Sequence, residues 1–232
     1  MKLSIVIPAY NEERTIAEII RRVKAVAVPG VEKEIVVVDD GSTDKTKKIL
    51  GSIAGIITVT HGKNLGKGGA VKTGFTHATG DIVLIQDADL EYSPDDYQDL
   101  LAPIISGLAD VVYGTRFLGN KPHRIFNFHH YLANRCITFL SNVFTNLNLS
   151  DIEVGYKVFT RNVVRAITPQ LKSRRFGIEV ELTARVAKRN FRIYEVAVSY
   201  AGRSYAEGKK INWKDGVAAL WHIVRFNLFD RS

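Results

Sequence analysis

The feature that most constrains the fold of this chain is a regular alternation of short apolar runs with longer stretches of helical periodicity. The apolar runs are rich in Val, Ile and Leu, as in the buried strands of a sheet that helices cover. We expect strands at 3–8, 34–38, 56–60 and 110–114 and in the apolar run 81–89 that ends in Asp87 and Asp89, and helices at 15–26, 43–50, 68–78 and 94–105. This order predicts an α/β fold with a mostly parallel sheet and right-handed crossovers.

Polar side chains follow three of the predicted strands at the points where those strands end. Residues 8–12 follow the first strand, Asp39 and Asp40 follow the second, and Asp87 and Asp89 follow the fourth. Because chemistry in such sheets collects at the carboxyl ends of the strands, we expect these side chains to gather along one edge. Residues two apart in an extended segment point the same way, so Asp87 and Asp89 could bind one hard cation together. The alternative is an acidic loop that caps the next helix.

A glycine-rich loop from His61 to Ala70 leads into a predicted helix. It could place backbone amides and Lys67 near a phosphate group, as helix amino termini do. The loop has neither a Gly-x-Gly-x-x-Gly pattern nor the Gly-Lys-Ser/Thr ending of a Walker loop, which disfavours a nicotinamide cofactor and ATP hydrolysis. A flexible turn with a solvated lysine is the alternative.

The net charge of +8 is concentrated in the last third of the chain. Residues 157–232 hold 16 Lys and Arg against 6 Asp and Glu, a net of +10, whereas residues 1–156 have a net of −2. Such a segment suggests phosphate, nucleic acid or an anionic membrane surface as partner, or else a solvated basic face. It carries no Lys/Arg-Gly-Phe motif and no obvious aromatic stacking platform, so we do not expect nucleic acid.

Three absences bear on the location of the protein. The single cysteine, Cys136, cannot form an intrachain disulfide, which favours a reducing compartment. The amino terminus does not have the pattern of a signal peptide, and no run approaches the roughly 18 to 20 apolar residues that span a bilayer. We therefore expect a soluble or peripheral protein.

The stretch from Arg124 to Leu147 is predicted to be an amphipathic helix. Apolar side chains recur there at helical spacing, at Ile125, Phe128, Leu132, Cys136, Phe139 or Leu140, Val143 and Leu147. A helix of this kind can lie in a membrane interface. Packing in the core or against a second copy of the chain is the alternative, and the same choice applies to residues 218–224.

Four motifs together resemble those of the family 2 glycosyltransferases with a GT-A fold, and more narrowly those of the polyprenyl-phosphate glycosyltransferases such as dolichyl-phosphate mannosyltransferases. The motifs are Val6–Glu13, Val37–Asp44, Asn64–Gly68 and Asp87–Asp89. The resemblance is strongest over residues 1–116 and continues through 151–157, 176–181 and 203–210. It implies a GT-A catalytic domain over residues 1–210, followed by a helical appendage over residues 211–232.

The resemblance also implies roles for particular residues. The nucleotide-sugar pocket would be formed by Pro8, Tyr10, Glu12, Asp39, Asp40, Lys67, Asp87, Ala88 and Asp89, with Asp40 facing the base or ribose and Asp39 supporting it. Asp89 would bind Mg²⁺ or Mn²⁺ with help from Asp87 and Glu91, where Glu91 departs from relatives with glutamine at that position. The acceptor phosphate would be held by Arg116, Arg135, Arg203 and Lys210, and the residues closest to the chemistry would be Asp87, Asp89 and Arg116.

The implied reaction is the transfer of a hexose from a nucleotide sugar to a polyprenyl phosphate, with inversion at the anomeric carbon. A phosphate acceptor is already anionic, so the reaction depends on charge stabilisation more than on a general base. We expect GDP-mannose as the donor, with UDP-glucose or a UDP-N-acetylhexosamine as the alternative. A sugar hydroxyl acceptor is a further alternative and would require a base such as Asp151 or Glu181. A module that binds a nucleotide sugar or RNA without catalysis is the non-enzymatic alternative.

For its location, we expect a cytoplasmic protein at the cytoplasmic face of a membrane. It would attach through its amphipathic and basic segments or through a membrane partner protein, and the helix at 124–147 would then guide the prenyl chain to the site. A homodimer is a further possibility that the sequence leaves open.

Overall fold

The computed structural model describes residues 1–119, 121–125, 127–175, 177–203 and 213–230. Its strands are β1 (Lys2–Ala9), β2 (Glu32–Asp39), β3 (Ile57–Thr60), β4 (Ile82–Ile85), β5 (Val111–Thr115), β6 (Lys157–Thr160) and β7 (Ile193–Ala197). Its α-helices are α1 (Ile16–Ala25), α2 (Thr46–Gly51), α3 (Lys67–His77), α4 (Tyr97–Ile105), α5 (Phe128–Thr145), α6 (Arg161–Ile167), α7 (Ile178–Ala187) and α8 (Trp213–Val224). Shorter helical turns lie at Pro94–Asp96, Thr168–Gln170 and Arg225–Phe229.

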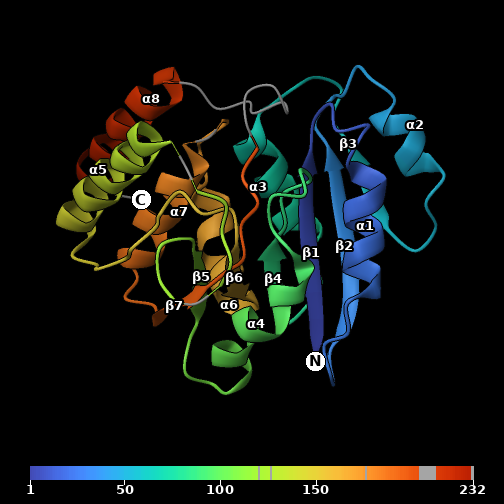
Figure 1. Cartoon of the computed structure of the whole chain (residues 1–232), viewed down its shortest axis with the longest axis horizontal. Coiled ribbons are helices and arrows are strands. Elements are labelled where there is room, and N and C mark those ends of the chain that lie inside the picture. The colour runs from blue at the N-terminus through green and yellow to red at the C-terminus, as the bar shows by residue number, and fades with distance from the viewer. Residues whose placement is uncertain (120, 126, 176, 204–212, 231–232) are drawn as a thin grey trace.

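The strands of this described part of the chain form one sheet in the order β3-β2-β1-β4-β6-β5-β7, with helices packed around it (Figure 1). The neighbouring pairs β3–β2, β2–β1 and β1–β4 are parallel, and β5 is parallel to β7. Strand β6 runs antiparallel to both β4 and β5. The predicted α/β fold with a mostly parallel sheet is therefore confirmed, whereas the antiparallel insertion of β6 was not predicted.

The predicted elements of the first half match the observed ones to within a few residues, because their apolar patterns are strong. In β1, Leu3, Ile5 and Val6 are fully buried, as expected for a central strand covered on both faces. In α1 the buried residues are Ile16, Ile19, Ile20 and Val23, which form one stripe at helical spacing. The predicted helix at 94–105 begins as a 3-10 turn at Pro94–Asp96 before α4.

Two glycines allow α3 to pack closely on its surroundings. A Cβ atom on Gly74 would lie 2.2 Å from Cγ1 of Val6, so the helix rests directly on β1. Gly66 precedes the helix with φ of +81°, and a Cβ atom there would lie 2.2 Å from the carbonyl oxygen of Arg174. Only glycine adopts this backbone conformation readily. The start of α3 is thus fixed against a segment far away in the sequence.

Helices α5 and α8 pack on each other at the end of the molecule opposite α1 and α2 (Figure 1). The apolar stripe predicted for α5 faces outward: Phe128 is 68% exposed and Phe139 is 69% exposed. The inward face of α5 consists of Ile137, Thr138 and Ser141. Most of the stripe therefore lies outside the core of the chain, whereas Leu140 and Leu147 are partly buried against it. Within the described ranges, no helix has both the length and the apolar character needed to cross a membrane.

The last described residues are tied to the rest of the protein by charged contacts. The carboxylate of Asp230 lies 3.0 Å from Nη2 of Arg185 and 2.8 Å from Nζ of Lys172. Helix α8 also contacts α7. The predicted boundary between residues 210 and 211 lies outside the described residues, so the division into a catalytic domain and an appendage stays a prediction.

Candidate active site

The carboxyl ends of β1, β2 and β4 open into a cavity of about 870 Å³. One end of this cavity carries charged and polar side chains, namely Tyr10, Glu12, Asp40, Lys67, Asp87, Asp89, Glu91 and Arg203. The other end lies between α5 and α8 and is mostly apolar, with Ala133, Cys136, Ile137, Val217, Ala219 and Leu220. Pro8, Ala88, Arg116, Glu153 and Glu179 also line it. The polar strand ends named from the sequence are thus brought together, apart from Asp39.

Three carboxylates at the polar end are held by cations and hydroxyls. Lys67 lies 2.7 Å from Asp87, and Nη2 of Arg203 lies 3.0 Å from Asp89. Glu91 accepts hydrogen bonds from the hydroxyl of Tyr200 and from the backbone amide of Arg203 at 2.9 Å. Burial raises the pKa of Asp89 to about 7, and repulsion from Asp87 and Glu91 adds to this, whereas Arg203 opposes it. Negative charge is therefore in excess at Asp89, which favours the arrival of a cation.

The donor set fits a hard divalent cation that takes few protein ligands. Among the described residues, no three side chains of His, Cys, Asp or Glu are grouped so that they could hold an ion by themselves. Mg²⁺ commonly binds to one or two carboxylates and completes its shell with water and substrate phosphate. Asp87 and Asp89 can supply those carboxylates, and the role of Glu91, which is bonded to both Tyr200 and Arg203, stays a prediction.

Asp40 organises the glycine-rich loop. Its carboxylate accepts hydrogen bonds from the amides of Leu65 at 2.9 Å and Gly66 at 2.7 Å, and Nδ1 of His61 lies 2.7 Å away. Asp39 is fully buried behind it and lies outside the lining of the cavity, where it accepts a hydrogen bond from the amide of Ser42 at 3.0 Å. The two aspartates thus shape the turn and the loop that border the polar end.

Lys67 stands at the start of α3 between two acidic groups. Its Nζ lies 2.7 Å from Asp87 and 2.9 Å from Glu179 on α7. Burial by itself would lower the pKa of Lys67, but the two carboxylates outweigh this and raise it. Glu179 also lies 2.5 Å from the buried Lys157 on β6. Lys67 is therefore charged and rigidly placed beside Asp87.

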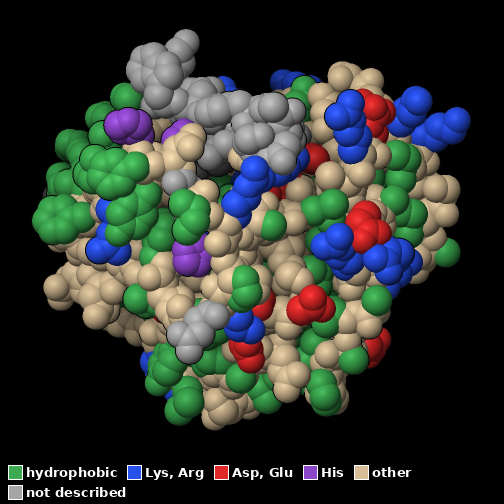
Figure 2. Space-filling view, in the orientation of Figure 1, with side chains coloured by type: hydrophobic (Ala, Val, Ile, Leu, Met, Phe, Trp, Pro, Cys, Tyr) green, Lys and Arg blue, Asp and Glu red, His purple; other side chains and the backbone are tan. Residues whose placement is uncertain are grey.

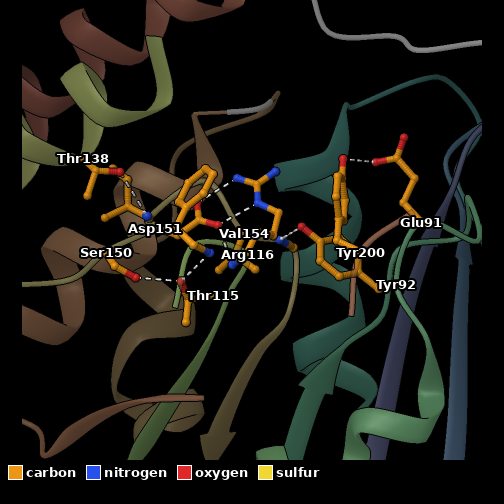
Figure 3. Close-up of polar contacts among 12 residues, drawn as sticks. Glu91, Tyr92, Thr115, Arg116, Thr138, Ser150, Asp151, Val154 and Tyr200 are labelled. Carbon is orange, nitrogen blue, oxygen red and sulfur yellow. Dashed lines mark hydrogen bonds and ion pairs between the residues drawn. The ribbon is translucent and has the colours of Figure 1, made fainter. Parts of the chain in front are cut away.

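Arg116 follows β5 and is held by Asp151 in a bidentate ion pair (Figure 3). Its Nε lies 2.6 Å from Oδ2 and its Nη2 2.7 Å from Oδ1 of Asp151. Burial opposes the charge on Arg116, but Asp151 outweighs it, so the pKa of Arg116 is raised. The guanidinium also lies 5.2 Å from the centre of the Tyr200 ring. The pair fixes a permanent positive charge at the wall of the cavity.

The remaining basic residues named from the sequence lie at different places relative to the cavity. Arg203 lines the cavity, but in contact with Asp89 and Glu91. Arg135 is exposed on α5 and is not part of the cavity lining, although its neighbours Asn134 and Cys136 are. Lys210 lies outside the described residues. The structure therefore brings Arg116 and Arg203 to the site and leaves Arg135 away from it.

Sequence reasoning named no role for several residues that the structure places at the site. Tyr200 lies between Glu91, to which its hydroxyl donates a hydrogen bond, and Arg116 (Figure 3). Glu179 holds Lys67, and the hydroxyl of Tyr92 accepts a hydrogen bond from the amide of Gly155 at 3.0 Å. Glu153 lines the cavity, and within the described ranges its buried Oε1 atom has no hydrogen-bond partner. Acidic residues within otherwise apolar segments were the available signal for Glu153 and Glu179.

Comparison with known proteins places the chain in a family of sugar-transferring enzymes. The sequence model of a family described as glycosyl transferase family 2 matches residues 4–168. An uncharacterized protein of Methanocaldococcus jannaschii is 27% identical, over 98% of this chain and 93% of its own length. The UDP-N-acetylglucosamine–dolichyl-phosphate N-acetylglucosaminyltransferase of Methanococcus voltae is 24% identical, over 97% of this chain and 95% of its own length.

Solved structures share the fold. A crystal structure of glucosyl-3-phosphoglycerate synthase from Mycobacterium tuberculosis, in complex with Mn²⁺, uridine diphosphate and phosphoglyceric acid, superposes with a TM-score of 0.75. It is 21% identical, and the match covers 97% of this chain and 76% of that one. A structure of the same enzyme with Mg²⁺ and uridine diphosphate gives a TM-score of 0.74 at 20% identity and covers 97% of this chain and 79% of that one. The fold of the chain is therefore the GT-A fold.

Proposed function

The chain belongs to glycosyl transferase family 2, and on that premise we propose that it transfers a hexose from a nucleotide sugar to the phosphate of a polyprenyl lipid, with inversion at the anomeric carbon. The observation that carries this proposal is the composition of the cavity, which joins a carboxylate-rich end to an apolar end between α5 and α8. A nucleoside diphosphate with its cation suits the first end. A prenyl chain suits the second.

The donor would bind at the polar end. Tyr10 and Pro8 would border the nucleoside, and Asp40 would keep the glycine-rich loop in place beside it. The Methanococcus voltae relative and the synthase structures are both named with uridine nucleotides, so UDP-N-acetylglucosamine is the first donor to test. GDP-mannose, which we expected from the sequence, and UDP-glucose follow it.

Asp89, together with Asp87, would hold Mg²⁺ or Mn²⁺ against the diphosphate. A bound ion would neutralise the negative charge that develops on the departing nucleoside diphosphate. Lys67 keeps the Asp87 carboxylate oriented through its contact at 2.7 Å. Arg203 would have to leave Asp89 for the ion to bind there, which frees a guanidinium group for phosphate.

The acceptor phosphate would lie against Arg116. Because a phosphate monoester is already anionic near neutral pH, the residues need only orient it and offset its repulsion from the diphosphate. A hydroxyl acceptor would need a free base, and the two carboxylates named for that role are both engaged. Asp151 is paired with Arg116, and the fully buried Glu181 accepts hydrogen bonds from the amide of Lys172 at 3.0 Å and pairs with Arg185. These contacts leave neither Asp151 nor Glu181 available as the base that a hydroxyl acceptor requires.

A lipid acceptor requires the protein to reach a membrane, and the outer face of α5 and α8 suits this. Side chains exposed on this face are Phe128, Leu132, Phe139, Val143 and Trp221. Figure 2 shows hydrophobic side chains gathered over these helices, with histidine and basic side chains among them. An apolar face with cationic neighbours is the composition of an interfacial membrane-binding surface. Docking through a partner protein, formation of a homodimer and location at the cytoplasmic face stay predictions.

The function is tested by transfer of radiolabel from UDP-N-acetylglucosamine, UDP-glucose and GDP-mannose to a short polyprenyl phosphate, with Mg²⁺ or Mn²⁺ present. Label that extracts into organic solvent from one donor would establish the donor and the acceptor class. Label that appears only on a free sugar, with none on the lipid, would replace the phosphate acceptor by a hydroxyl acceptor.

The membrane surface is tested separately by flotation of the pure protein with liposomes of phosphatidylglycerol and phosphatidylcholine. We expect flotation of the wild type and its loss in the double variant Phe128→Ser and Phe139→Ser. Protein that stays in the aqueous fraction would exclude direct docking.

A further inference from the structure

One carboxyl group in the cavity has no role in the chemistry described above. Glu153 lines the cavity, and its Oε1 atom is buried with no hydrogen-bond partner among the described residues. Most buried polar side-chain atoms in proteins are hydrogen-bonded, and leaving one unpaired costs free energy. Such an atom at the wall of a binding cavity indicates a ligand that supplies the missing hydrogen bond.

The position of Glu153 along the chain places it between two parts of the site. Two residues before it, Asp151 holds Arg116. Two residues after it, Gly155 lies so close to the carboxylate of Asp87 that a Cβ atom would be 2.1 Å from Oδ2. The segment that carries Glu153 therefore connects the wall at Arg116 to the carboxylates at the polar end.

The backbone around Glu153 is held rigidly. Nζ of the buried Lys157 donates hydrogen bonds to the carbonyl oxygen of Ile152 at 3.0 Å and to that of Val154 at 2.5 Å. The same ammonium group lies 2.5 Å from Glu179. Because these bonds fix the backbone on both sides of Glu153, its side chain is presented to the cavity by a preorganised support.

The surroundings of Glu153 decide which kind of ligand it can take. Burial raises the pKa of Glu153 to about 7, repulsion from Glu179 adds to this, and Lys157 and Arg116 oppose it. A phosphate group would add to the repulsion, and the ammonium group of Lys157 is already bonded to Glu179 and to two carbonyl oxygens. A neutral hydroxyl group donates a hydrogen bond without bringing a second negative charge.

We propose that Glu153 is a specificity-determining residue that accepts a hydrogen bond from a hydroxyl group of the transferred hexose. The inference rests on the proposed function, in which the hexose must lie between the diphosphate at Asp89 and the acceptor phosphate at Arg116. Glu153 is the carboxyl group on the segment that joins these two regions, and its unpaired oxygen matches the hydroxyl groups that a hexose presents. The residue thus selects the sugar, while other residues hold the nucleotide.

The test compares nucleotide sugars with the corresponding nucleoside diphosphates. Binding of UDP-N-acetylglucosamine, UDP-glucose and UDP, and of GDP-mannose and GDP, is measured by calorimetry with Mn²⁺ for the wild type and for Glu153→Ala. In the wild type we expect the accepted nucleotide sugar to bind more tightly than its diphosphate. At pH 8, where the Glu153 carboxyl group is ionised, Glu153→Ala should weaken the binding of that nucleotide sugar about 10- to 100-fold, the effect of losing one hydrogen bond to a charged group, and leave the binding of the diphosphate unchanged.

Deoxygenated donors identify the hydroxyl group. Analogues of the accepted donor that lack one sugar hydroxyl at a time are titrated against both proteins. One analogue should bind weakly to the wild type and lose no further affinity in Glu153→Ala. Glu153→Gln retains an acceptor oxygen at nearly the same place and should recover part of the lost affinity. If the alanine variant binds weakly only because its fold is disrupted, the glutamine variant gives no such evidence of a lost hydrogen bond. It also serves as the test variant if the alanine variant does not fold.

Several outcomes overturn the inference. Equal weakening of the nucleotide sugar and the diphosphate would show that Glu153 supports the pocket and does not contact the sugar. Unchanged binding of both, together with slower transfer, would place Glu153 at the acceptor. A wild type that binds the nucleotide sugar but does not glycosylate polyprenyl phosphate would contradict the proposed acceptor and leave this test intact. A wild type that binds none of the nucleotides would overturn both proposals.

Discussion

Replacement of Glu153 by glutamine should change how the stability of the protein depends on pH. The folded state holds the pKa of this buried carboxyl at about 7, whereas its ordinary value is 4.5. Between these two pH values the folded chain binds the proton and the unfolded chain does not. The free energy of unfolding therefore falls as the pH rises from about 4.5 to about 7, because the native state must then accept a buried charge.

The size of the effect follows from the two pKa values. At about 1.4 kcal/mol for each pH unit that separates them, a pKa of about 7 against 4.5 corresponds to about 3 kcal/mol at pH 8. Glutamine has nearly the same shape and does not ionise. Between pH 4 and pH 8, the free energy of unfolding of the variant should thus rise by about 3 kcal/mol relative to that of the wild type.

Urea unfolding at several pH values measures this difference directly. Groups far from Glu153 titrate in the same way in both proteins, so their contributions cancel when the two curves are subtracted. Glu32→Gln, at an exposed position at the start of β2, is the matched control and should give a difference that does not depend on pH. If the difference between Glu153→Gln and the wild type is also constant with pH, burial does not hold a proton on Glu153 and the reasoning is refuted.

Three further changes test the site and its support. Asp89→Ala should abolish transfer without lowering the melting temperature, since it removes a cation ligand that faces the cavity; wild-type turnover would remove Asp89 from the metal site. Asp151→Asn should lower the free energy of unfolding in urea by about 3–5 kcal/mol, because it removes the carboxylate that neutralises the buried charge of Arg116, and a loss below about 1 kcal/mol would contradict this. Gly30→Ala and Gly66→Ala both place alanine at a positive φ, but only at Gly66 would the new Cβ meet backbone, 2.2 Å from the carbonyl oxygen of Arg174. Gly66→Ala should therefore lower the free energy of unfolding by about 1–3 kcal/mol more than Gly30→Ala does in the same assay. Equal losses of stability would argue against that contact.

The acidic edge of the sheet could be predicted because it depends on local order along the chain. An apolar run predicts each strand, and the residue that follows the run must lie at the carboxyl end of that strand. Asp40, Asp87 and Asp89 were located in this way, and the structure places them around one cavity. Arg135 shows the limit of the same approach, since its place on a helix did not reveal that it points away from the site.

The contacts between distant segments could not be predicted from periodicity. The pairing of Arg116 with Asp151 depends on how the segment before β6 returns to the end of β5. The contact of Lys67 with Glu179 depends on how α7 approaches the start of α3. No pattern within one segment contains this information, because an ion pair is defined by the approach of two segments and not by the spacing within either.

The sequence by itself determined the α/β class, the approximate bounds of the first nine elements and the sheet edge at which the polar residues gather, because periodicity and strand order are local properties. Only the tertiary structure decided that β6 enters the sheet antiparallel, that the apolar stripe of α5 faces outward and that Glu153 has an unpaired oxygen at the cavity. Periodicity shows that a helix has an apolar face, but what covers that face depends on every other element that could pack against it.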